Sequence, residues 1–127
     1  MKRLATPILL LLLCATLTAW AQKPPIRVKF QKGQSTTVLR GNVRGGDIDR
    51  YLLSANAGQQ MTVRLVSAQG AGVAADIWMP NSKRVAQGGY GTTSWSGRIP
   101  ETGDCWLVVS TVGKGKGGPY TLEVSIR

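Results

Sequence analysis

Short runs in which apolar and polar residues alternate recur along the chain, separated by breaks rich in Gly, Asn, Asp or Pro. Alternation with a period of two is typical of a β-strand that has one buried side and one side facing water. The runs predict about eight strands, at residues 26–30, 37–43, 51–55, 61–65, 75–79, 95–99, 105–109 and 120–126. No stretch after residue 21 has the apolar spacing of an amphipathic helix. We therefore predict an all-β fold, an antiparallel β-sandwich.

The beginning of the chain has a different pattern, that of a secretory signal peptide. Two basic residues precede an apolar run at residues 8–13, and Ala19-Trp20-Ala21 provides small residues around a cleavage position. This order is typical of an exported protein, and the apolar run is shorter than the ~20 residues of a membrane-spanning helix. We predict a signal peptide over residues 1–21, one binding domain over residues 22–127, no transmembrane span, and a periplasmic or secreted location.

The composition limits the chemistry that the domain can perform. The chain has no His, and Cys105 is the only Cys after the predicted leader. A Ser-His-Asp triad, a Cys-His pair, a His-containing zinc site and an intrachain disulfide are thereby excluded. Asp47 and Asp49 alternate at strand spacing and would share a face, where two carboxylates could act as acid and base or hold a metal. Asp47, however, lies in a glycine turn, where Asp commonly bonds its own backbone. We interpret both as structural, and predict a protein that is not an enzyme and uses no metal or cofactor.

Cys105 has two interpretations, because a lone thiol in an exported protein can pair between chains. It alternates with Leu107 and Val109, which places it on the apolar side of its strand. We interpret it as a buried, unreactive thiol, with an inter-chain disulfide as the alternative. The expected assembly is a monomer or a homodimer.

The chain is strongly basic, with 16 Lys and Arg against 6 Asp and Glu and a net charge of +10. Several basic residues lie on the polar side of predicted strands: Arg27, Lys29, Arg40, Arg44 and Arg64. On one sheet face they would create a broad positive field suited to anionic envelope glycans. The alternative is a solvated face that protects strand edges. Export and the lack of a recognition motif argue against nucleic acid as a partner.

Two tryptophans, Trp78 and Trp106, lie opposite the apolar side of their strands. They would form an aromatic platform for sugars or a protein partner if they are exposed. The alternative is that both faces of a central strand are covered.

A series of motifs runs through residues 26–127. Its members are Val28–Gly33, Gly41–Val43, Asp49–Leu53, Ala57–Val63, Ile99–Asp104 and Gly118–Val124. Together they resemble the bacterial periplasmic inhibitors of goose-type (g-type) lysozyme and, more loosely, the pre-peptidase C-terminal β-sandwich domains of secreted proteases. The resemblance implies a β-sandwich that protects peptidoglycan by blocking the substrate groove of the lysozyme.

The resemblance also implies a partner site. Lysozyme inhibitors of several families use a Ser-Gly-x-Tyr type loop, and the matching stretch here is Thr102-Gly103-Asp104, with Cys105 in place of the aromatic residue. Lys114 and Lys116 lie between glycines, from where they could pair with the groove's carboxylates. Arg44 could join them from the Gly45-Gly46 turn, where an exposed aromatic of the family pattern is missing. The predicted site residues for g-type lysozyme are Thr102, Gly103, Asp104, Lys114, Lys116, Arg44 and Gly46.

Overall fold

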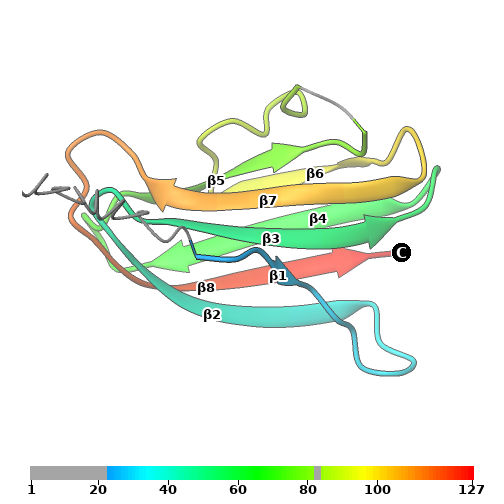
Figure 1. Cartoon of the computed structure of the whole chain (residues 1–127), viewed down its shortest axis with the longest axis horizontal. Coiled ribbons are helices and arrows are strands. Elements are labelled where there is room, and N and C mark those ends of the chain that lie inside the picture. Colours follow the sequence, from blue (N-terminus) through cyan, green and yellow to red (C-terminus); the bar gives the residue numbers. More distant parts are fainter. Residues whose placement is uncertain (1–22, 82–83) are drawn as a thin grey trace, which may run out of the picture.

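The computed structural model describes residues 23–81 and 84–127, and the predicted signal peptide lies outside this part of the chain (Figure 1). The strands are β1 (Ile26–Arg27), β2 (Thr36–Arg44), β3 (Ile48–Ala55), β4 (Gln60–Ser67), β5 (Val73–Trp78), β6 (Ser94–Arg98), β7 (Gly103–Thr111) and β8 (Gly117–Ile126). The described residues form no helix, and they contain none that is long and apolar enough to cross a membrane. The predicted all-β class is confirmed.

The strands form two sheets of four strands each, which face one another (Figure 1). Sheet A has the order β1-β3-β7-β5, and sheet B has the order β2-β8-β4-β6. Every pairing between these strands is antiparallel except that of β1 with β3. The alternation in the sequence explains this architecture, because each strand has one apolar side to bury against the opposite sheet. The predicted β-sandwich is confirmed.

The core lies between the two sheets and consists of the apolar positions of the alternating runs. In β7, Cys105, Leu107 and Val109 are fully buried, whereas the residues between them are partly exposed. Leu122 and Val124 of β8 are also fully buried on the inner side of sheet B. Burying one such aliphatic side chain stabilises the fold by about 1.5–3 kcal/mol. The core therefore depends on the same residues that produced the period-two pattern.

The first predicted strand, residues 26–30, is longer than the observed β1. The Val28 N–H still donates to the Leu52 carbonyl at 2.8 Å, but the ladder ends there. The physical reason is the connection: β1 pairs in sheet A, whereas β2 pairs with β8 in sheet B. The chain must therefore leave sheet A within a few residues. Val28 and Phe30 nevertheless pack against the core, as their apolar phase predicts.

The interpretation of Cys105 as a buried thiol is confirmed by its complete burial. Burial, followed by the nearby Asp104 charge, raises the pKa of the thiol to about 11, so the reactive thiolate is scarce at neutral pH. We expect the folded protein to form no disulfide-linked dimer and to react with a thiol reagent only after denaturation. Non-reducing electrophoresis and a timed thiol assay check this, and a covalent dimer of folded chains would contradict it.

Candidate functional site

The predicted site residues lie at opposite ends of the sandwich. Thr102 is in the turn between β6 and β7, and Gly103 and Asp104 begin β7, whereas Lys114 and Lys116 are in the loop that follows β7. β7 has 9 residues, so at ~3.3 Å per residue about 27 Å separates the two groups. Figure 1 shows the β6–β7 turn and the β7–β8 loop at the two ends of the long axis. One lysozyme groove cannot receive both groups through a single inserted loop.

The residues of the β6–β7 turn are engaged in contacts that hold the fold together. The Ala57 N–H donates to Thr102 Oγ1 at 3.1 Å, and Asn81 Nδ2 donates to the Thr102 carbonyl at 3.2 Å. These bonds fasten the turn to the β3–β4 connection and to the segment after β5. The hydroxyl of Thr102 is therefore occupied within its own chain.

Asp104 is held in a similar way on the outer face of sheet A. Arg27 donates to both of its carboxylate oxygens, at 3.1 and 3.0 Å, and Ser54 Oγ donates at 3.1 Å. The hydrogen bond from Arg27, followed by that from Ser54, lowers the pKa of the Asp104 carboxyl. The three residues come from β1, β3 and β7, so this cluster ties the short β1 to its sheet.

The opposite end carries three exposed cations, which we call the basic end: Arg44, Lys114 and Lys116. Arg44 is the last residue of β2 and lies directly beside Gly117 in the β2–β8 ladder. The chain neighbour of Gly117 is Lys116, so the register brings Arg44 next to the β7–β8 loop. Within residues 23–81 and 84–127, none of the three cations forms an ion pair.

The β2–β3 turn at the basic end is closed by Asp47. Its N–H donates to the Arg44 carbonyl at 2.9 Å, and its carboxylate accepts from the Arg44 N–H at 3.1 Å. The structural interpretation of Asp47 is confirmed, because the carboxylate bonds its own turn. The hydrogen bond from Asp47 to Arg44 closes a narrow four-residue turn. Gly46 lies at its exposed tip, with open space around the position of an added Cβ.

The β7–β8 loop is attached to the β4–β5 loop by backbone hydrogen bonds. The Val112 N–H donates to the Gly72 carbonyl at 2.7 Å, and the Gly117 N–H donates to the Ala71 carbonyl at 2.9 Å. Within the loop, the Gly115 N–H donates to the Val112 carbonyl at 3.1 Å. Although the loop is rich in glycine, these bonds fix both of its ends and its middle. Lys114 and Lys116 are thus presented on a defined backbone.

Beneath the basic end, a polar network joins the two sheets inside the core. Tyr51 of sheet A and Tyr120 of sheet B share a hydrogen bond of 2.5 Å between their hydroxyls, and Tyr120 donates to Asp49 at 2.7 Å. Lys23 donates to the other oxygen of Asp49 at 3.1 Å. Burial, followed by the hydrogen bonds with Tyr51 and Asp49, raises the pKa of the Tyr120 hydroxyl. The structural interpretation of Asp49 is confirmed.

Sequence reasoning did not find this network. The sequence feature that indicates it is an Asp at a position of β3 that faces the core, together with two Tyr residues that also face the core, one in β3 and one in β8. A buried carboxylate needs hydrogen-bond donors, and Tyr120 and Lys23 supply them.

The five basic residues of the predicted strands do not share one face. Arg27 is bound to Asp104 on sheet A, whereas Arg40, Arg44 and Arg64 are on the outer side of sheet B. β1 lies in sheet A, whereas β2 and β4 lie in sheet B. Arg27 of β1 therefore cannot form a single surface with the arginines of β2 and β4. The positive field that we predicted is therefore divided.

Trp78 and Trp106 are direct neighbours across the β5–β7 ladder, on the outer face of sheet A. Both are half-buried. Val85, in the segment after β5, forms an isolated β-bridge with Trp78. This segment therefore covers part of the pair of indoles. The two indoles are therefore neither a fully exposed platform nor part of the core.

Comparisons with known proteins identify relatives at the level of structure. No protein-family model and no curated protein sequence matches the chain. The PliG of Aeromonas hydrophila, a periplasmic inhibitor of g-type lysozyme, aligns with a TM-score of 0.68 and 27% identity, over 81% of this chain and 96% of its own. The PliG of Salmonella Typhimurium aligns with a TM-score of 0.65 and 22% identity, over 83% and 99% of the two chains.

A pre-peptidase C-terminal domain of a Bacillus anthracis collagenase has the same fold, with a TM-score of 0.57 and 19% identity over 83% of this chain and 96% of that one. Each of these structures is nearly whole within the alignment, so the similarity covers an entire domain. The resemblance to periplasmic inhibitors of g-type lysozyme that the sequence motifs indicated is thus confirmed.

Proposed function

We propose that this protein inhibits g-type lysozyme by placing its basic end in the substrate groove. The observation that carries the proposal is the position of Arg44 at the end of β2, beside the β7–β8 loop that carries Lys114 and Lys116. All three are exposed and without an ion-pair partner among the described residues. Gly46 completes the site as the narrow tip of the β2–β3 turn. Thr102, Gly103 and Asp104 lie outside this interface, because they are at the other end of the domain.

The mechanism is occlusion, supported by charge pairing. Glycosidase grooves carry a pair of carboxylates, and a Lys or Arg that reaches them forms charge-assisted hydrogen bonds. These bonds strengthen as the inserted loops exclude water from the groove. The backbone hydrogen bonds of the β7–β8 loop reduce the conformational entropy that is lost on binding. No bond is made or broken, so the protein acts without catalysis.

The similarity to the Aeromonas hydrophila inhibitor supports this function, since it extends over nearly the whole of that protein. The same similarity supports a periplasmic or secreted location. A single chain contributes all the residues of the basic end, so the proposed activity requires only a monomer and is equally open to a homodimer that leaves this end free.

The direct test is a titration of the mature protein into g-type, c-type and i-type lysozymes that are clearing a peptidoglycan suspension. We expect inhibition of the g-type enzyme, saturating near one inhibitor per enzyme, and no effect on the other two. Equal inhibition of all three lysozyme types would contradict recognition of a groove that is specific to the g-type enzyme. Unchanged clearance in every case would overturn the proposed function.

A further inference from the structure

The outer face of sheet B carries a row of hydroxyl groups that crosses all four strands. Its members are Thr36, Ser125, Thr62 and Ser96, which are paired in register. Neighbouring strands are ~4.8 Å apart, so the hydroxyls form a regular ladder. At one end of the row, Ser96 accepts a hydrogen bond of 2.9 Å from Gln60 Nε2 and lies 3.3 Å from the Thr62 hydroxyl.

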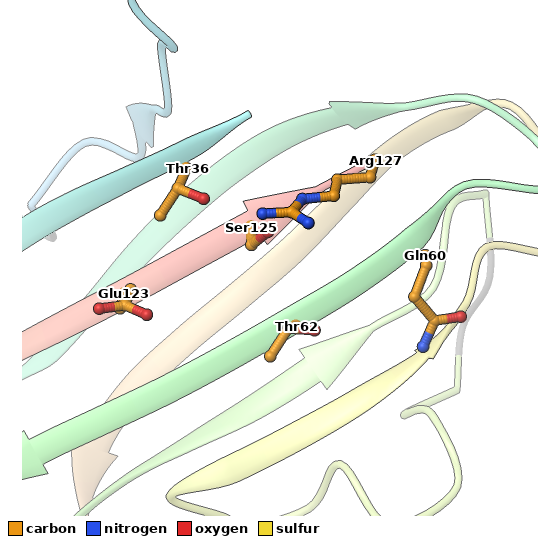
Figure 2. A pocket seen from close by; sticks show the side chains of 6 residues that line it. All are labelled: Thr36, Gln60, Thr62, Glu123, Ser125 and Arg127. Carbon is orange, nitrogen blue, oxygen red and sulfur yellow. The ribbon is translucent and has the colours of Figure 1, made fainter. Parts of the chain in front are cut away.

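A shallow hollow of about 390 Å³ follows this row. Figure 2 shows its lining residues, which are Thr36, Thr62 and Ser125 of the hydroxyl row together with Gln60, Glu123 and Arg127. The Arg127 side chain points back along the sheet toward Ser125 (Figure 2). The hollow therefore combines neutral donors and acceptors with charged groups of both signs.

Arginines flank the hydroxyl row on both sides. Arg64 is two residues along β4 from Thr62, on the same side of the sheet, and opposite Glu123. On the other side, Arg98 pairs with Gln60, and Gln60 exchanges backbone hydrogen bonds of 2.8 and 3.0 Å with Arg127. All three arginines are exposed, and none forms an ion pair within the described part of the chain. Three arginine side chains thus face water around the side chain of Glu123.

We propose that this face, which we call the hydroxyl face, binds a glycan chain that carries carboxylate groups. The planar fork of an arginine matches a carboxylate and bonds it in two places. The hydroxyls and the Gln60 amide can both donate to and accept from sugar hydroxyls. A linear glycan that lies along the row meets one protein hydroxyl at each strand. The inference does not depend on lysozyme inhibition, because it concerns a different surface.

The central carboxylate of Glu123 favours this ligand over a more densely charged one. It accepts hydrogen bonds from sugar hydroxyls, whereas it would repel a dianionic phosphate placed over the same row. The hydroxyl face has no aromatic side chain among its lining residues, so binding rests on charge and hydrogen bonds instead of stacking. Such binding weakens as salt is added, because exposed charges are screened.

The test is retention of the full mature protein on immobilised hyaluronan, which has one carboxylate for every two sugars. We compare R64Q/R98Q with K29Q/K32Q, a matched control that removes the same charge from exposed residues of the β1–β2 connection. We expect roughly tenfold weaker binding for R64Q/R98Q, because it loses two solvent-exposed ion pairs with the ligand carboxylates. The control should bind less than about twofold more weakly. Lysozyme inhibition should be unchanged in both variants.

A second variant, T62V, removes a hydroxyl from the middle of the row at constant charge. We expect it to weaken hyaluronan binding several-fold while circular dichroism shows a folded protein. Equal losses in R64Q/R98Q and K29Q/K32Q, or no loss in T62V, would overturn the proposal and indicate attraction by net charge alone. Retention on dextran sulfate or duplex DNA with none on hyaluronan would also overturn it.

Discussion

Reversing the charge of the two loop lysines, as K114E/K116E, is expected to raise the concentration for half-inhibition of g-type lysozyme more than about 100-fold. Each Glu replaces a charge-assisted hydrogen bond by a repulsion against the groove's carboxylates, and losing one partner of a desolvated charged pair costs about 2–5 kcal/mol. Both side chains are exposed on a loop that backbone hydrogen bonds hold in place. The thermal unfolding midpoint should therefore stay the same while clearance assays show the loss.

The matched control is K29E/K32E, which makes the same change in net charge on exposed residues of the β1–β2 connection. It separates contact at the basic end from long-range attraction or repulsion between the two proteins. Long-range effects act through the association rate and diminish with salt, so K29E/K32E should differ from wild type by less than about threefold at physiological salt. Full inhibition by K114E/K116E would remove the basic end from the proposed interface.

The fold could be predicted from the sequence because a single local property determines most of it. Residues 120–126 alternate strictly, and Leu122 and Val124 are completely buried in the structure. A period of two fixes which side of each strand faces the core, and glycine-rich breaks mark the turns. The pairing of strands is not a local property, so the division into the orders β1-β3-β7-β5 and β2-β8-β4-β6 needed the structure.

The site was harder to predict, because it depends on which turns meet in space. Thr102 and Lys114 are only a dozen positions apart in the sequence, but β7 runs between them and carries them to opposite ends. Arg44 is far from Lys116 in sequence, and the β2–β8 register brings them together. The occupation of Thr102 and Asp104 by contacts with Ala57 and Arg27 was likewise invisible, since those partners come from other strands.

The backbone beneath the basic end is expected to be the most sensitive position in this part of the chain. Gly117 has φ +78°, and an added Cβ would collide with the Val43 carbonyl oxygen in the neighbouring strand. The left-handed backbone costs an ordinary residue about 1–2 kcal/mol, and forcing an atom into a packed site adds about 1–3 kcal/mol. We expect Gly117→Ala to lower the free energy of unfolding by about 2–5 kcal/mol, measured by urea denaturation.

Gly113→Ala is the matched control, because Gly113 also has a left-handed backbone, at φ +58°, but no atom lies within 4 Å of an added Cβ. It should cost only the about 1–2 kcal/mol of backbone strain. The difference between the variants therefore measures the contact between Gly117 and β2. That contact also sets Arg44 beside Lys116, so Gly117→Ala should weaken inhibition under conditions where it remains folded. If both variants lose equal stability, the close approach of β8 to Val43 does not define this end of the domain, and the convergence of the three cations loses its structural basis.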